Sequence, residues 1–315
     1  MDIKYYNSQE VREKLSMKTC IELMRQVFLG LSKGEVTNQL RSVLPIESGK
    51  LMGVMPALLP YEEVVGAKLI TVFHDNFKAK LPSHQGVVAL FSTTDGQLMG
   101  ICDGMAITAV RTGAVSAVAT DCLANKSAQV LCLMGAGVQA GTHLEAISLV
   151  RELKKVNVWS IYQEEAKNFI EKYSKSYPQI DFTAFENPGE AVRDADIICT
   201  VTASHTPVLK GEWLKPGVHI NAVGACSAKD RELDGQAMAK GKLVCDSRVS
   251  CLNEAGDYLL AKSEGMIVVE DILAEIGDVL SGKSHIRQSE DDITIFEALG
   301  LAAEDIACAA WLLKQ

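Results

Sequence analysis

Leu131-Cys132-Leu133-Met134-Gly135-Ala136-Gly137-Val138-Gln139-Ala140 is the segment from which the fold of this chain is predicted. A short apolar run passes directly into the pattern Gly-x-Gly-x-x-Ala, and an amphipathic stretch follows. This order is typical of a dinucleotide-binding βα unit, in which Gly135 permits a tight turn and Gly137 lets the backbone approach a pyrophosphate. The helix that follows would direct free N–H groups and its positive end at the phosphates. A purely structural glycine turn is the alternative, and the adjoining strand and helix patterns favour the cofactor.

The middle of the chain alternates strand and helix patterns. This predicts an α/β fold built on a Rossmann-type, doubly wound parallel sheet. The expected strands are mostly apolar, as strands covered on both faces should be. They are 131–134, 156–160, 196–202, 219–224 and 243–246, and the expected helices among them are 139–153, 164–173 and 188–194.

The first part of the chain has a different pattern, which predicts a separate α+β domain. A helical stretch at 9–31 precedes several strand-like runs, a hairpin turn at 94–96 and a long helix of small residues at 105–120. The strand-like runs are 40–46, 51–55, 66–73, 87–92 and 98–102. We expect 295–313 to be helical and to pack back onto this domain. The predicted domains are therefore a discontinuous one, 1–117 with 291–315, and a dinucleotide-binding one, 118–290.

Composition narrows the class of protein. The chain has 315 residues, a formal net charge of −9 and scattered basic residues, so we expect neither a nucleic-acid nor a membrane partner. The N-terminus does not resemble a signal peptide. Nine cysteines without a Cys-x-x-Cys pair suggest reduced thiols and a cytoplasmic location, and the spacing of the six histidines predicts no metal site.

Three cations interrupt apolar segments of the first domain: Arg41, Lys68 and Arg111. A charge within a buried element is costly unless it is paired. Two interpretations follow from the pattern alone. The cations form a site for an anionic group such as a carboxylate, which a guanidinium fork matches, or their long stems carry three charges out to solvent.

Seven segments occur in an order that is highly specific: 51–57, 81–85, 111–117, 135–140, 211–217, 220–225 and 231–234. Through them the chain resembles the ornithine cyclodeaminase/mu-crystallin family from about residue 40 to residue 305. The mu-crystallin branch, whose members act as ketimine reductases, is the most similar. The resemblance implies a homodimer that associates through the first domain, which would also bind the substrate.

The resemblance also implies roles for individual residues. Arg41, Lys68 and Arg111 match the catalytic and carboxylate-binding cations, and Met55 and Cys226 match positions beside the substrate. The positions that match cofactor-binding residues are Ser83, His84, Arg111, Thr112, Gly135, Ala136, Gly137, Val138, Gln139, Ser160, Ile161, Tyr162, Thr200, Val201, Thr202, Ala222, Val223, Gly224, Ala298, Leu299 and Gly300.

Cys226 is one departure from the family pattern. Cyclodeaminases and alanine dehydrogenases of the family have an aspartate there, close to the reacting amine. A carboxylate can take a proton from an ammonium group or hold it by charge, and a thiol does neither well. Mu-crystallin-like reductases also lack that aspartate, and Asp230 lies one residue away from their own acidic position. We expect Cys226 to be a small space-filling residue.

The end of the second strand of the cofactor domain is the other departure. An acidic residue there would bind the ribose of NAD, and an arginine would favour the 2′-phosphate of NADP. Ser160-Ile161-Tyr162 offers neither. Because Glu164 and Glu165 follow and oppose a phosphate, NAD(H) is slightly favoured over NADP(H).

For the activity, the resemblance implies an NAD(P)H-dependent reductase of cyclic ketimines, such as pyrroline- or piperideine-2-carboxylate. Two alternatives stay open. One is a lyase of the ornithine cyclodeaminase type, which converts L-ornithine to L-proline and ammonia with bound NAD. The other is a non-catalytic binder of small ligands that has kept the cofactor and the fold.

Overall fold

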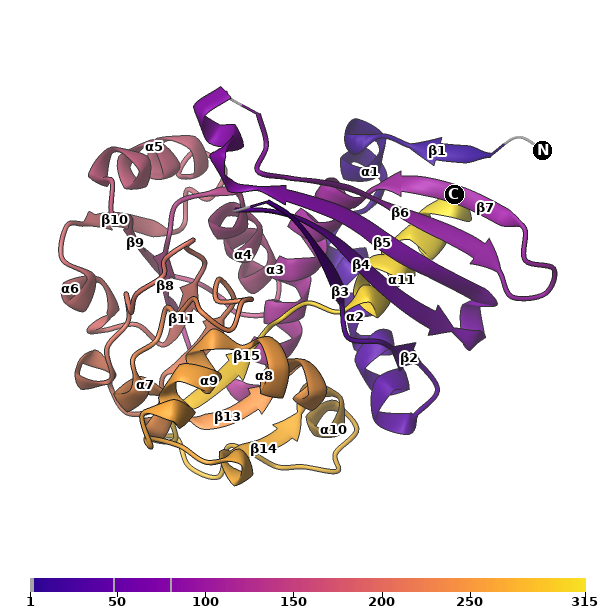
Figure 1. Ribbon diagram of the computed structural model, residues 1–315. Helices are drawn as coiled ribbons and strands as arrows, with labels where there is room; N and C mark the ends of the chain where they lie inside the picture. Colours follow the sequence, from indigo (N-terminus) through magenta and orange to yellow (C-terminus); the bar gives the residue numbers. More distant parts are fainter. Residues whose placement is uncertain (1–2, 48, 80) are drawn as a thin grey trace. The chain divides into compact units, whose positions relative to one another are not determined.

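Figure 1 shows the computed structural model, which describes residues 3–47, 49–79 and 81–315. The chain divides into two compact units, Met1–Arg111 with Leu301–Gln315 and Thr112–Gly300. The predicted domain boundaries at 117/118 and 290/291 therefore move to 111/112 and 300/301. The functions expected of the two parts stay predictions. Among the described residues, no helix is long and apolar enough to cross a membrane.

The larger unit contains the predicted parallel, doubly wound sheet (Figure 1). The strand order is β10-β9-β8-β11-β12-β15-β13-β14, and every neighbouring pair is parallel. The order reverses between β8 and β11, and open α/β sheets bind ligands at the carboxyl ends of the strands beside such a point. The strands are β8 Val130–Met134, β9 Lys155–Trp159, β10 Asp181–Phe185, β11 Ile197–Thr200, β12 His219–Ala222, β13 Lys242–Cys245, β14 Ile272–Glu275 and β15 Thr294–Glu297.

Helices connect these strands, as crossovers between parallel strands require. They are α4 Val138–Ser148, α5 Gln163–Tyr173, α6 Pro188–Val192, α7 Gly235–Lys240, α8 Arg248–Glu254, α9 Gly256–Ser263 and α10 Ile276–Leu280. Two short 3₁₀ helices, η3 Gly211–Trp213 and η4 Val269–Asp271, lie in the connections. A core of buried Cys, Met, Ile, Leu and Val side chains occupies the space between sheet and helices.

The smaller unit contains a mixed sheet in the order β1-β7-β6-β5-β4-β2, with β3 paired to β4. Helix α11 packs against β4, β5, β6 and α2 of this unit. The strands are β1 Lys4–Tyr6, β2 Thr37–Asn38, β3 Ser42–Glu47, β4 Lys50–Leu59, β5 Val64–Phe73, β6 His84–Ser92 and β7 Leu98–Asp103. The helices are α1 Ser8–Lys14, α2 Met17–Lys33, η1 Pro60–Glu62, η2 His74–Ala79 and α11 Ala302–Leu313, and α3 Gly104–Leu123 continues into the larger unit.

Two element predictions were wrong. The helical stretch expected at 9–31 is two helices, because the Ser16 hydroxyl accepts the Thr19 N–H and starts α2 anew. The helix expected at 295–313 begins only at Ala302. The residues before it, Thr294–Glu297, form β15 between β12 and β13. Their β-branched and aromatic side chains suit a buried strand.

Candidate functional site

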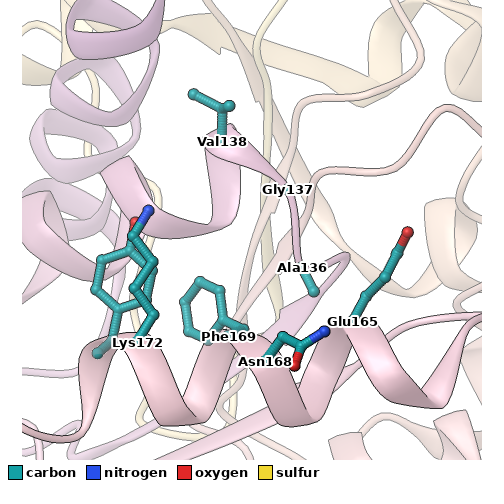
Figure 2. A pocket seen from close by; sticks show the side chains of 8 residues that line it. Ala136, Gly137, Val138, Glu165, Asn168, Phe169 and Lys172 are labelled. Carbon is teal, nitrogen blue, oxygen red and sulfur yellow. The ribbon is translucent and has the colours of Figure 1, made fainter. Parts of the chain in front are cut away.

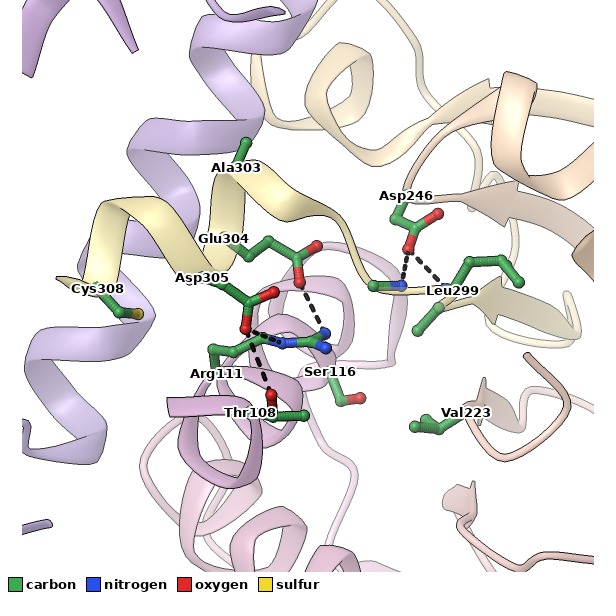
Figure 3. A network of polar contacts seen from close by, with 12 residues as sticks. Thr108, Arg111, Ser116, Val223, Asp246, Leu299, Ala303, Glu304, Asp305 and Cys308 are labelled. Carbon is green, nitrogen blue, oxygen red and sulfur yellow. Dashed lines mark hydrogen bonds and ion pairs between the residues drawn. The ribbon is translucent and has the colours of Figure 1, made fainter. Parts of the chain in front are cut away.

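A buried cluster of charged side chains lies within the smaller unit (Figure 3). Lys68 of β5 and Arg111 of α3 are 2% and 7% exposed, and Glu304 and Asp305 of α11 are fully buried. Arg111 Nη1 lies 2.8 Å from Glu304 Oε2, and its Nε lies 3.4 Å from Asp305 Oδ1. Lys68 Nζ lies 3.3 Å from Asp305 Oδ1 and donates to Thr108 Oγ1 at 2.6 Å. Two of the three predicted cations are therefore buried and do not reach solvent.

The local fold explains how these charges meet. Lys68 lies on the face of β5 that α11 covers, directly opposite buried Met55 of β4. Glu304 and Asp305 occupy the first turn of α11, where the helix dipole favours negative charge. Asn38 Oδ1 accepts the backbone N–H of Ala303, which holds the start of that helix. The sheet and the helix therefore fix both sides of the cluster.

Burial and the neighbouring charges act together on Lys68. Arg41 is half-buried and lies close enough for its charge to act on Lys68. Burial, the largest effect, lowers the pKa of Lys68, and the positive charges of Arg111 and Arg41 also lower it. The carboxylate of Asp305 raises this pKa but does not outweigh them, so the pKa of Lys68 is below its usual value. Such an ammonium group gives up its proton more readily than an exposed lysine.

Sequence reasoning missed Glu304 and Asp305. The signal was available, because these two acids interrupt the otherwise apolar stretch Ala302–Leu313 in the same way that the cations interrupt theirs. A buried carboxylate needs a partner just as a buried cation does.

The glycine loop of the larger unit has the backbone that a dinucleotide needs. Gly135 has a φ of 116°, and a Cβ there would lie 2.8 Å from the carbonyl oxygen of Val201. Gly137 is the N-cap residue of α4, and apart from its chain neighbours nothing lies within 4 Å of the place where its Cβ would be. Ala136, Gly137 and Val138 line a pocket of about 390 Å³ together with residues of α5 (Figure 2). The open space over Gly137 at the start of a helix fits a pyrophosphate.

The loops after β11 and β12 are joined by Glu232, which sequence reasoning also missed. Glu232 Oε1 accepts the N–H and the hydroxyl of Thr202 at 2.6 Å, and its Oε2 accepts the Gly224 N–H at 2.7 Å. The backbone N–H of Glu232 in turn donates to Asp257 Oδ1. Burial raises the pKa of Glu232, and burial together with Glu232 raises the pKa of Asp257 to about 7. The positions predicted around Thr200–Thr202 and Ala222–Gly224 thus lie on neighbouring strand ends.

The segment 298–300 is held at the same edge of this sheet. Asp246 Oδ2 accepts the N–H groups of Leu299 and Gly300 at 2.6 and 2.7 Å (Figure 3). The Ala298 N–H donates to the carbonyl oxygen of Ala222 at 2.9 Å. Asp246 is a further buried carboxylate that the sequence did not single out.

The remaining predicted residues have other surroundings. Cys226 is half-buried, and its Sγ lies 3.2 Å from the Val223 carbonyl oxygen. Asp230, considered as a substitute acid, pairs with His205.

In the smaller unit, Ser83 Oγ and His84 Nδ1 lie 2.9 Å apart at the start of β6, and His84 is exposed. Within 3–47, 49–79 and 81–315, no group of three or more His, Cys, Asp or Glu is arranged to hold a metal ion.

Known proteins resemble the chain along nearly its whole length. A model of the ornithine cyclodeaminase/mu-crystallin family matches residues 3–315. The ketimine reductase mu-crystallin of Mus musculus is 38% identical over 312 residues, which cover 97% of this chain and 95% of that protein.

Two solved structures have the same fold over the full chain. One is the Δ(1)-pyrroline-2-carboxylate reductase of Thermococcus litoralis in complex with NADH and L-proline, with a TM-score of 0.95 and 35% identity over 98% of this chain and 96% of that one. The other is an archaeal alanine dehydrogenase dimer with bound NAD, with a TM-score of 0.94 and 31% identity over 100% and 96%.

Proposed function

The chain belongs to the ornithine cyclodeaminase/mu-crystallin family, and from this premise we propose that it reduces the C=N bond of a small cyclic α-imino acid with a reduced nicotinamide cofactor. The observation that carries the proposal is the buried charge cluster, in which the cations Lys68 and Arg111 lie against two carboxylates and the charge of Arg41 acts on Lys68. The carboxylate of the imino acid would bind to the cations of this cluster. Similarity to a ketimine reductase and a pyrroline-2-carboxylate reductase supports the substrate class.

Arg111 and Arg41 bind the substrate carboxylate in this proposal. The pairing of Arg111 with Glu304 and Asp305 fixes the plane of its guanidinium group. A guanidinium held in one orientation binds a carboxylate at little cost in conformational entropy. Met55, opposite Lys68 on the neighbouring strand, contributes an apolar surface for the ring of the imino acid.

Lys68 supplies the proton. When bound, the reduced nicotinamide provides a hydride for C2 of the C=N bond. The protonated iminium is the better hydride acceptor, and Lys68, with its lowered pKa, is the group suited to protonate the nitrogen. The π electrons of the C=N bond then become the lone pair of the amine. Asp305 and Thr108 hold the ammonium group of Lys68 in one position for this transfer.

The cofactor would bind at the glycine loop Gly135–Gln139 and along the loops after β11 and β12. The open backbone at Gly137 and the start of α4, where no side chain caps the helix, support the pyrophosphate position. Glu232 and Asp246 are positioning residues, because Glu232 holds Thr202 and Gly224, Asp246 holds the backbone of 299–300, and neither need touch the cofactor. We further propose NAD(H) over NADP(H), since Ser160, Ile161 and Tyr162 include no guanidinium group for a 2′-phosphate.

Cys226 supports reduction over the lyase reaction. Its Sγ lies against the Val223 carbonyl oxygen, where the cyclodeaminases of the family carry an aspartate beside the amine. Retention of a buried lysine in the charge cluster likewise supports an enzyme over a ligand-binding protein, because a binder of carboxylates has no need of a proton donor.

We also propose that two copies associate through the smaller unit. Helices α2 and α11 lie on one side of its sheet, and exposed apolar side chains lie on the outward positions of the strands, including Leu44, Val65, Phe91 and Met99. An exposed apolar face of this kind marks an interaction surface. The solved alanine dehydrogenase is a dimer, which supports the proposal. Light scattering should give twice the monomer mass, and Phe91→Glu should reduce it to that of a monomer.

The activity is tested by mixing the protein and NADH with Δ1-pyrroline-2-carboxylate or Δ1-piperideine-2-carboxylate. We expect loss of the reduced-nicotinamide absorbance with an equal amount of proline or pipecolate formed. Ammonia release from L-ornithine without net change in the cofactor would favour the lyase. Cofactor binding without turnover of either imine would contradict the proposal.

A further inference from the structure

The cofactor domain lacks an acid at the place where an NAD-binding fold normally has one. In such folds a carboxylate at the end of the second strand accepts hydrogen bonds from the ribose of the adenosine. Here that strand is β9, and Ser160 follows it directly. Ser160 is 7% exposed and has no charge to offer.

A carboxylate from the next helix reaches this position. The Ser160 hydroxyl donates to Glu165 Oε2 at 2.8 Å, and its oxygen accepts the Tyr162 N–H at 3.3 Å. The Glu165 N–H bonds to the Tyr162 carbonyl oxygen at 2.9 Å, which fixes the first turn of α5 against the strand end. The buried serine therefore holds the exposed Glu165 carboxylate beside the end of β9.

Glu165 also faces the glycine loop. It lines the pocket of about 390 Å³ that Ala136 and Gly137 line from the other side, as Figure 2 shows. The ribose of the adenosine is joined directly to the pyrophosphate, so a carboxylate in the same pocket as the pyrophosphate loop is within reach of the ribose hydroxyls. Lys172 lies farther along α5 in this pocket, with its Nζ 4.8 Å from the centroid of the Tyr173 ring.

We propose that Glu165, oriented by Ser160, is the residue that selects NAD(H): it accepts hydrogen bonds from the adenosine ribose and repels a 2′-phosphate. This inference rests on the proposed function only in that a nicotinamide dinucleotide binds the glycine loop. The Ser160–Glu165 pair thus does the work of the single strand-end acid found in other NAD-binding folds.

The test measures dissociation constants of NADH and NADPH, without any imine, by titrating the nicotinamide fluorescence. We expect wild type to bind NADH at least about tenfold more tightly. Glu165→Gln should lower this preference by about tenfold or more, because the neutral amide no longer repels a 2′-phosphate and forms weaker hydrogen bonds with the ribose hydroxyls than a carboxylate does. Ser160→Ala should shift the preference in the same direction by less. Circular dichroism melts show whether each variant is folded.

Glu164→Gln is the matched control. Glu164 is the neighbouring exposed acid in the same turn of α5, and its replacement removes the same charge. We expect it to leave the NADH preference within about twofold, since it does not line the pocket.

Several results would overturn the inference. Equal shifts in Glu164→Gln and Glu165→Gln would show a general charge effect, and an unchanged preference in folded Glu165→Gln would remove the residue from the site. A wild-type preference for NADPH would indicate that Lys172 binds the 2′-phosphate in this pocket and that Glu165 does not repel it. If neither dinucleotide binds, both this inference and the cofactor proposal fail. Selective NADH binding without imine turnover would contradict the proposed reaction alone.

Discussion

At the scale of single residues, the central feature is a set of charges taken out of water. Isolated, Lys68 or Arg111 would be costly to bury. Each has a carboxylate partner on α11, and the hydroxyl of Thr108 accepts a further hydrogen bond from Lys68. The cost of burying these charges is therefore largely offset by their pairing.

Arg111→Ala should abolish most imine reduction. Loss of a buried, charge-assisted contact to a carboxylate costs about 2–5 kcal/mol, or roughly 30-fold to several thousand-fold in kcat/KM. The variant should also melt at a lower temperature, because Glu304 loses the partner that lies 2.8 Å away. NADH affinity should change far less. Steady-state kinetics, NADH titration and a thermal melt measure these three effects.

Arg111→Lys is the control for charge alone. It keeps a cation near Glu304 but loses the planar fork that matches a carboxylate, so stability should recover more than activity. A fall in kcat/KM of less than about fivefold in Arg111→Ala would show that Arg111 does not hold the substrate.

The sequence identified the cations of this cluster and not their partners, for a physical reason. A cation that interrupts an apolar run can be recognised from its neighbours in the sequence, and Arg41, Lys68 and Arg111 were identified in this way. Which acid neutralises it depends on the tertiary fold, since Arg111 and Glu304 are 193 residues apart. The Ser160–Glu165 bond could not be read from the sequence either, because it depends on how α5 starts after β9.

At the scale of elements, the sequence predicts those segments whose conformation is set by their own residues. It does not predict segments whose conformation depends on pairing with strands that are distant in the sequence. The tight turn predicted between β8 and α4 is present, because its conformation is set by Gly135 itself. The strand β15 was mistaken for the start of a helix, because only pairing with β12 and β13 makes Thr294–Glu297 extended. Because β15 pairs within the parallel sheet, residues up to Gly300 belong to the larger unit, and the boundary between the two units lies at 300/301.

Two glycine substitutions in this loop should separate cofactor binding from folding. Gly137 has a negative φ and, apart from its chain neighbours, nothing within 4 Å of an added Cβ, so Gly137→Val should fold normally and weaken NADH binding. Gly135 has a φ of 116° and the Val201 carbonyl oxygen in the way, so Gly135→Val should lower the melting temperature. Thermal melts and NADH titration distinguish the two. Unchanged NADH affinity in folded Gly137→Val would remove this loop from the cofactor site.

At the scale of the whole molecule, buried titratable groups couple stability to pH. His143 Nδ1 donates to the Gln139 carbonyl oxygen and its Nε2 accepts from Ser116, which leaves the ring neutral. Burial lowers the pKa of His143 from 6.5 to about 4. Between these values the unfolded chain binds a proton that the folded chain does not, so the histidine destabilises the fold as pH falls below about 6.5. The raised pKa values of Glu232 and Asp257 act in the opposite direction.

Because these contributions oppose each other, a variant is needed to isolate the histidine. His143→Gln keeps a side chain that can donate and accept but cannot titrate. Relative to this variant, wild type should lose about 2 kcal/mol of unfolding free energy between about pH 8 and pH 5. Urea unfolding at the two pH values measures the difference. Parallel changes in both proteins would show that His143 does not titrate in this way.

The transfer of hydride to an imine carbon can be followed directly with isotope. The protein is mixed with Δ1-pyrroline-2-carboxylate and NADH that carries deuterium at the transferred position of the nicotinamide ring, and the proline formed is analysed by mass spectrometry. We predict one deuterium at the α-carbon of proline for each NADH oxidised. Proline that contains no deuterium, or NADH that stays reduced while the imine is intact, would contradict the proposed reaction.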